Sequence, residues 1–131
     1  MKFEGGNAQD IRQRSFAYAL RAIRLYQALA ERKDGAAWVL GRQYLKSATS
    51  IGANIEEAQS GESRADFIHK YGIAQKEARE SLYWLRLLAE SKILPKHRLN
   101  PITHETDELI AIITTIIVRA KGQTARRRDG G

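Results

Sequence analysis

The chain has 131 residues, is 43% hydrophobic and carries a formal net charge of +7. This length predicts one domain with a single packed core. It contains no cysteine, which excludes disulfides, thiolate zinc sites and thiol nucleophiles. It has neither an apolar run long enough to cross a membrane nor an apolar segment typical of a secretory signal near Met1. We therefore expect a cytoplasmic protein without a membrane partner.

The positive charge is concentrated at the two ends of the sequence. Residues 1–35 carry a net charge of +3 and residues 92–131 a net charge of +4, whereas the middle is nearly balanced. Basic ends favour a polyanionic partner, either RNA or DNA. A solvated surface that serves only solubility explains the same distribution equally well.

The pattern predicts a flexible N-terminus over residues 1–8, followed by a first helix that is capped by Asp10 and ends near Arg32. Two adjoining apolar stripes give this helix a wide predicted core face: Phe16, Ala19, Ile23, Tyr26 and Ala30 in one, and Tyr18, Ala22, Leu25 and Leu29 in the other. Residues 33–35 then predict a helix stop and a tight connection.

A second helix is predicted over residues 36–59, and its small residues indicate close packing. Its core stripe recurs at alternating gaps of four and three: Tyr44, Ala48, Ile51, Ile55 and Ala58. Gly52 costs about 1 kcal/mol of helix stability relative to alanine, which indicates that a neighbouring backbone comes close. Ser47, Ser50 and Asn54 form a polar line beside the stripe. They either fix the register between helices by hydrogen bonds or line a ligand site, and we favour register.

A third helix is predicted from a capping box at Ser63 to about Ser91. Its core stripe comprises Phe67, Tyr71, Ala74, Ala78, Leu85 and Leu88. A second face, predicted to contact another subunit, comprises Ile73, Glu77, Glu80, Trp84 and Leu87. The side opposite the core stripe carries a short basic stripe with one aromatic residue: Lys76, Arg79, Tyr83 and Arg86.

The fourth helix is predicted to start with Asn100 as its N-cap and Pro101 at its first position. Residues 109–118 are apolar all round, so this helix needs cover on more than one side. In a bundle of this size the second side requires a partner, which predicts oligomer contacts at Ile112 and Ile113. Residues 9–121 thus form the predicted all-α, up-down-up-down four-helix bundle, and residues 122–131 a flexible basic tail.

No constellation of catalytic, cofactor-binding or metal-ligating residues is convincing. Asp66 and His69 give one pair with di-metal spacing where two are needed, and Asp66 is better explained as part of a cap. Glu77 and Glu80 share a face, but ion pairs with basic side chains explain them more simply than acid–base chemistry. The expected protein is therefore not an enzyme and holds no metal or cofactor.

The basic side chains are the strongest candidates for binding, in this case to nucleic-acid phosphates. They are Arg14, Arg21, Arg24, Lys76, Arg79, Arg86, Arg126, Arg127 and Arg128. Assembly into a ring would multiply each of these charges by the number of subunits. Sequence-specific readout is not indicated, because no DNA-reading motif is visible.

Residues 47–58, SATSIGANIEEA, resemble the signature of the small four-helix proteins that include the 23S ribosomal-RNA intervening-sequence proteins. Residues 63–70 and 76–88 are similar to the third helix of that family, and the resemblance extends over about residues 18–121. It implies a left-handed up-down bundle that assembles as a homopentameric ring. Some members of the family are encoded within insertions in the large ribosomal RNA gene.

The family is also similar in fold to basic pentamers that accompany diversity-generating retroelements and bind nucleic acid and a reverse transcriptase. No enzymatic activity is established for the family, so no catalytic residues carry over. The leading hypothesis is a non-enzymatic oligomer that binds RNA or DNA. The alternative is a scaffold for a protein partner, including a reverse-transcriptase accessory role.

Overall fold

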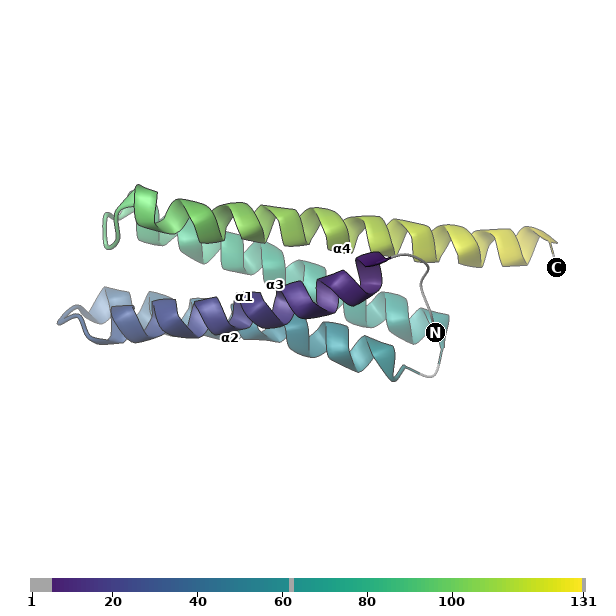
Figure 1. Ribbon diagram of the computed structural model, residues 1–131, viewed down its shortest axis with the longest axis horizontal. Helices are drawn as coiled ribbons and strands as arrows, with labels where there is room; N and C mark the ends of the chain where they lie inside the picture. Colours follow the sequence, from purple (N-terminus) through teal and green to yellow (C-terminus); the bar gives the residue numbers. More distant parts are fainter. Residues whose placement is uncertain (1–5, 62, 131) are drawn as a thin grey trace.

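The computed structural model describes the backbone of residues 6–61 and 63–130, and the side chains of residues 11–61 and 63–123. This part of the chain is all α-helical and contains no strand. Its helices are α1 (Gly6–Ala30), α2 (Gly35–Gln59), α3 (Arg64–Glu90) and α4 (Lys96–Gly130). Figure 1 shows them side by side, with the α1–α2 and α3–α4 connections at one end and the α2–α3 connection at the other. None of these helices is long and apolar enough to cross a membrane.

Each helix packs against two others, which closes the arrangement around one core. The neighbouring pairs are α1–α2, α2–α3, α3–α4 and α1–α4, and the last of these makes the sparsest contacts. The largest fully buried side chains include three tyrosines, Tyr18, Tyr44 and Tyr71. The prediction of an all-α protein with four helices is confirmed, and its packing is compatible with a bundle.

The cap predicted for α3 at Ser63 is present, and α2 has a cap that the sequence reasoning did not predict. Asp34 is the N-cap of α2, and its carboxylate accepts hydrogen bonds from the N–H groups of Ala36 and Ala37 at 3.0 and 3.4 Å. Ser63 caps α3, and its Oγ accepts the N–H of Asp66 at 3.0 Å. Each cap satisfies N–H groups that the first helical turn leaves without partners.

The predicted starts of α1 and α4 are wrong, because each helix begins earlier than its strongest local signal. Asp10 lies inside α1, and Pro101 lies inside α4. The first turn of α4 forms where the carbonyl of Pro95 accepts the N–H groups of Arg98 and Leu99 at 3.0 and 3.3 Å. The buried side chain of Leu99 then ties that turn to the core. At the other end, the helical backbone of α4 continues to Gly130, past the predicted limit at residue 121.

The core stripes of α2 and α3 are confirmed at every position, whereas one of the two stripes predicted for α1 is wrong. Tyr18, Ala22 and Leu29 are fully buried, but Phe16 is 67% exposed and Ile23 38% exposed. α1 packs only against α2 and α4, so the two neighbours cover a narrower arc than its apolar residues span. Apolar side chains are therefore left on the outer surface of α1.

Gly52 lies where α1 comes close to α2, as the sequence predicted. A Cβ atom at this position would lie 3.3 Å from the Oγ of Ser15 and 3.4 Å from its carbonyl oxygen. These separations are tighter than ordinary van der Waals contact, and one of the neighbouring atoms belongs to the backbone. The helix cost of the glycine is thus offset by the close approach of the two helices.

The apolar segment 109–118 of α4 lies mostly in the core of this one chain. Leu109, Ile113 and Ile116 are buried, Ile112 is partly covered and Val118 is 63% exposed. The prediction that Ile113 contacts another subunit is wrong, because its side chain is fully buried within its own chain. Ile112 and Val118 still have surface that a partner could cover.

Candidate nucleic-acid interface

The basic stripe on α3 lies on the outside of the molecule. Lys76, Arg79 and Arg86 are all exposed, and Tyr83 between them is 53% exposed. Their spacing places them along one side of the helix over roughly 15 Å, at 1.5 Å per residue. Within the described side chains, none of the three cations makes an ion pair. The stripe therefore offers unneutralised charge and an aromatic ring to solvent.

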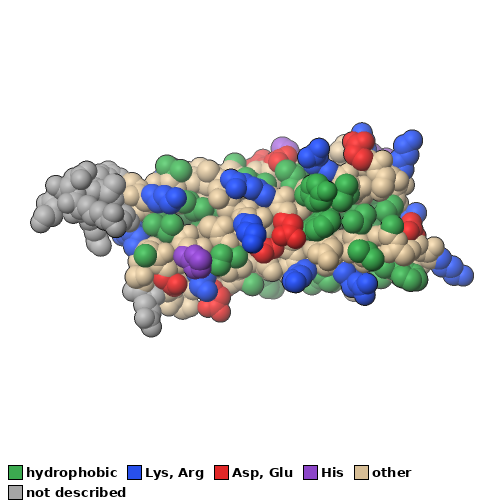
Figure 2. All heavy atoms as spheres, turned by 180° about the vertical axis from the view of Figure 1, so that it is seen from behind, with side chains coloured by type: hydrophobic (Ala, Val, Ile, Leu, Met, Phe, Trp, Pro, Cys, Tyr) green, Lys and Arg blue, Asp and Glu red, His purple; other side chains and the backbone are tan. Residues whose placement is uncertain are grey.

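The predicted second face of α3 runs beside this stripe and is only half covered. All five of its residues keep partial exposure: Ile73, Glu77, Glu80, Trp84 and Leu87. Burial, followed by the neighbouring charge of Glu80, raises the pKa of the Glu77 carboxyl. The Nε1 of Trp84 is buried and has no hydrogen-bond partner among the described residues. Figure 2 shows apolar side chains gathered on this side of the molecule, with Lys and Arg side chains around them.

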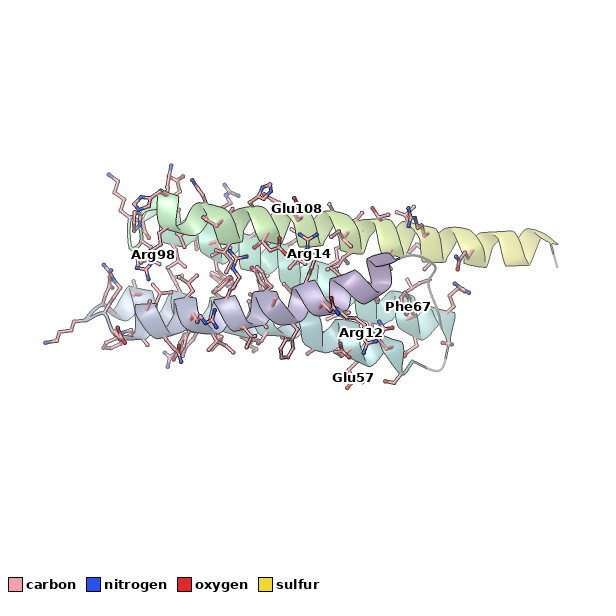
Figure 3. The ribbon with its side chains drawn as sticks, viewed as in Figure 1. Arg12, Arg14, Glu57, Phe67, Arg98 and Glu108 are labelled. Atoms are coloured by element: carbon pink, nitrogen blue, oxygen red, sulfur yellow. The ribbon has the colours of Figure 1, made fainter. Side chains whose placement is uncertain are left out.

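Arg14 does not belong to a free basic surface, although the sequence predicted it as a phosphate ligand. Its Nε and Nη2 donate to the two carboxylate oxygens of Glu105 at 3.0 and 2.7 Å, and Nη2 also lies 3.5 Å from Glu108. Hydrogen bonding to Glu105 raises the pKa of Arg14. In Figure 3 Arg14 and Glu108 lie between α1 and α4. Arg14 therefore links two helices, and its charge is neutralised within the chain.

The other two predicted cations of α1 lie together at a groove between α1 and α4. Arg21 and Arg24 line this groove with Arg98, which comes from the first turn of α4. The sequence reasoning missed Arg98 because it treated residues 92–100 as a loop. The early start of α4 is what places Arg98 beside α1. Arg126, Arg127 and Arg128 lie outside the described side chains.

Of the three side chains predicted to set helix register, one forms a hydrogen bond between helices. The Oγ atoms of Ser47 and Ser81 are 2.8 Å apart, which links α2 to α3. Ser50 instead donates to the carbonyl of Lys46, and Asn54 to the carbonyl of Ser50, both within α2. Side chains of this kind readily bond to the carbonyl one turn earlier, and here that local bond is formed.

The main polar contact between helices is a buried row of hydroxyl groups that the sequence reasoning missed. Tyr44 Oη donates to Tyr18 Oη at 3.0 Å, and Tyr18 Oη lies 2.6 Å from Thr106 Oγ1. Thr106 in turn donates to the carbonyl of Ile102 at 2.7 Å. The row joins α2, α1 and α4, and burial raises the pKa of both tyrosines. The available signal was tyrosine, rather than phenylalanine, at core positions of two adjacent helices.

The histidine and aspartate residues weighed for metal binding are dispersed. His69 is exposed on α3, and Asp66 lies in the first turn that Ser63 caps. The Nε2 of His104 lies 3.1 Å from a carboxylate oxygen of Glu108, one turn along α4. Among the described residues, no three His, Asp or Glu side chains gather closely enough to hold a metal ion.

Comparison with known proteins finds a matching family and a similar solved structure. The model of a family described as "23S rRNA-intervening sequence protein" matches residues 7–115. A crystal structure of a protein of unknown function from the S23 ribosomal protein family of Bacteroides thetaiotaomicron is 37% identical in sequence. The match covers 85% of this chain and 97% of that one, with a TM-score of 0.80. No curated protein sequence matches the chain.

Proposed function

The chain belongs to the 23S rRNA-intervening sequence protein family, and from that premise we propose that it is a non-enzymatic oligomer that binds nucleic acid. The observation that carries this proposal is the stripe on α3, where Tyr83 is exposed among three unpaired cations. Cations along one side of a helix attract the phosphate backbone. An exposed aromatic ring beside them stacks on an unpaired base, which favours a single-stranded segment.

The proposal includes a ring of subunits built from left-handed up-down bundles. It is supported by two apolar surfaces on different helices: the half-covered face of α3 around Trp84, and the exposed Phe16, Leu20 and Ile23 of α1. Two different surfaces that cover each other in successive subunits make a head-to-tail interface, and such an interface closes into a ring when the rotation permits. Each ring would then present several copies of the basic stripe.

The binding experiment compares two variants that lose the same charge. One replaces the stripe cations (Lys76→Gln, Arg79→Gln, Arg86→Gln), and the control replaces three exposed cations elsewhere (Arg32→Gln, Lys33→Gln, Arg42→Gln). Fluorescence anisotropy with a short single-stranded RNA measures affinity across a salt series. We expect the stripe variant to bind at least about tenfold more weakly than the control. We also expect its salt slope to be smaller in magnitude by about 2, because each lost phosphate contact on a single strand removes about 0.7.

The wild-type protein should bind single-stranded RNA or DNA at low salt, and its affinity should fall steeply as salt is added. Absence of binding to both polymers at low salt would overturn the proposed function. Equal losses in the stripe and control variants would mean that total charge, rather than the α3 stripe, determines affinity.

Assembly is tested at Trp84, the largest side chain on the half-covered face of α3. Trp84→Ala removes apolar area that a second subunit would cover, so we expect the mass in solution to fall toward that of the single chain. Light scattering measures the mass, and circular dichroism shows that the helices remain. Tyr83→Ala is the matched control, because it removes the neighbouring aromatic ring from the adjoining stripe. A mass that Trp84→Ala leaves unchanged contradicts this interface.

A further inference from the structure

The groove between α1 and α4 gathers positive charge without negative charge. It has a volume of about 250 Å³ and is lined by Arg21, Arg24, Leu25, Arg98 and Ile102. No residue of α3 lines the groove, and Figure 1 shows α3 behind α1 and α4. Figure 3 shows Arg98 on the side of α4 that faces α1. The groove is thus a separate feature from the surface considered above.

The three arginines of the groove have no anionic partner within the part of the chain that the structure describes. No carboxylate lines the groove, and none of the three guanidinium groups makes an ion pair there. Two acidic residues further along α4 are already engaged, because Glu105 pairs with Arg14 and Glu108 with Arg14 and His104. Three cations around one groove repel each other, and an anion between them would relieve that repulsion.

The chemistry of the groove suits a phosphate group. Arg21 and Arg24 are three residues apart on one side of α1, and Arg98 approaches from α4. Guanidinium groups bind phosphate oxygens through pairs of parallel N–H donors, which makes arginine better suited than lysine to such a site. Leu25 and Ile102 add apolar surface that the sugar or base attached to a phosphate could contact.

The walls of the groove are held in place by contacts inside the bundle. The carbonyl of Ile102 accepts the hydroxyl of Thr106, which is bonded to Tyr18 of α1. The Arg14–Glu105 pair links the same two helices further along. The spacing of α1 and α4 is therefore set before any ligand arrives, which lowers the cost of binding.

We propose that the α1–α4 groove is a phosphate-binding site, with Arg21, Arg24 and Arg98 as its ligands. The phosphate comes either from a nucleic-acid chain or from a free nucleotide or polyphosphate. The site does not depend on the α3 stripe, so it stands or falls separately from the function proposed above.

The test uses the full chain and two substitutions of the same three arginines. Arg21→Gln/Arg24→Gln/Arg98→Gln removes the charge, and Arg21→Lys/Arg24→Lys/Arg98→Lys keeps the charge but removes the paired donors. The control is the Arg32→Gln/Lys33→Gln/Arg42→Gln variant, which loses equal charge outside the groove. One arm measures the rise in melting temperature with millimolar pyrophosphate or ATP, against chloride at equal ionic strength. The other arm measures anisotropy with single-stranded RNA.

We expect pyrophosphate and ATP to raise the melting temperature of the wild type and of the control, and the glutamine variant to lose this rise. The lysine variant should lose most of it, because paired donation is lost while charge remains. If the glutamine variant also binds RNA at least about tenfold more weakly than the control, the phosphate belongs to a nucleic-acid chain. If its RNA binding matches that of the control, the ligand is a free nucleotide or polyphosphate.

The groove proposal is overturned if the glutamine variant behaves like the control in both arms. It is also overturned if pyrophosphate and ATP do not stabilise the wild type and RNA binding does not depend on the three arginines. A wild type that binds no RNA but gains stability from pyrophosphate through these arginines would overturn the proposed function and support the groove.

Discussion

Ile113→Ala is expected to lower the free energy of unfolding by about 3 kcal/mol, within the range for large-to-small changes in a packed core. The Ile113 side chain is fully buried on α4, so the change removes apolar contacts and leaves a cavity. Val118→Ala on the same helix is the control, because Val118 is 63% exposed and its truncation should stay within about 0.5 kcal/mol. Urea denaturation followed by circular dichroism measures both.

The comparison separates a core role for Ile113 from a role between subunits. Truncation of a core residue destabilises the chain at every protein concentration. The stability lost by truncating an interface residue instead depends on protein concentration. Equal and small effects of the two substitutions would contradict the burial of Ile113. A loss at Ile113 that disappeared at high protein concentration would restore the subunit contact that the sequence predicted.

Tyr18→Phe is expected to cost about 3 kcal/mol, more than removal of either neighbouring hydroxyl. Tyr18 is the middle of the buried row, accepting from Tyr44 and bonded to Thr106. Because Thr106 donates to the carbonyl of Ile102, Tyr18 must donate to Thr106. Loss of the Tyr18 hydroxyl leaves the Tyr44 donor and the Thr106 acceptor without this partner, and each unpaired buried group costs about 1–3 kcal/mol.

Two matched variants complete this experiment. Thr106→Val leaves the Tyr18 hydroxyl without its acceptor, and Tyr44→Phe only removes the donor at the end of the row. The expected order of destabilisation is therefore Tyr18→Phe, then Thr106→Val, then Tyr44→Phe. Thermal and urea denaturation measure the three free energies. If Tyr44→Phe were the most damaging of the three, the direction of donation derived for the row would be wrong.

The same row predicts how stability responds to alkaline pH. Burial raises the pKa of both Tyr18 and Tyr44 in the folded protein, whereas an unfolded tyrosine titrates near about 10. At alkaline pH the folded state then holds more protons than the unfolded state. The stability that depends on the protonated tyrosines is therefore fully present below the unfolded pKa and is lost as pH rises above it. Tyr18→Phe removes one of these groups and should make the alkaline decline shallower.

Periodicity predicted the fold well where a helix is covered by two dense interfaces. Every apolar residue of the α2 and α3 stripes is buried, because each of these helices packs closely against both of its neighbours. The same reasoning predicted too wide a core on α1, where Phe16 lies outside. Periodicity shows how wide an apolar face is, but not how much of it the chain's own helices cover.

The candidate site was harder to predict because the sequence does not show which basic side chains are paired with acidic ones in the fold. Arg14 and Arg24 look alike on α1, yet one is paired with Glu105, a residue 91 positions away, and the other lines an acid-free groove. Arg98 was missed because the Asn100–Pro101 signal placed the start of α4 too late. Asn54 stood out in the sequence, but its hydrogen bond is to its own helix.

The uneven packing of the four helices implies an order in which the molecule opens. α1 and α4 meet most sparsely, and the described polar links between them are the Arg14 ion pairs and the Tyr18–Thr106 hydrogen bond. The α2–α3 pair instead makes the densest contacts of the four, through small and apolar side chains together with the Ser47–Ser81 hydrogen bond. We therefore expect that α1 separates from α4 before α2 separates from α3 when the fold opens locally. Any molecule that bridges α1 and α4 slows the first step by which the fold comes apart.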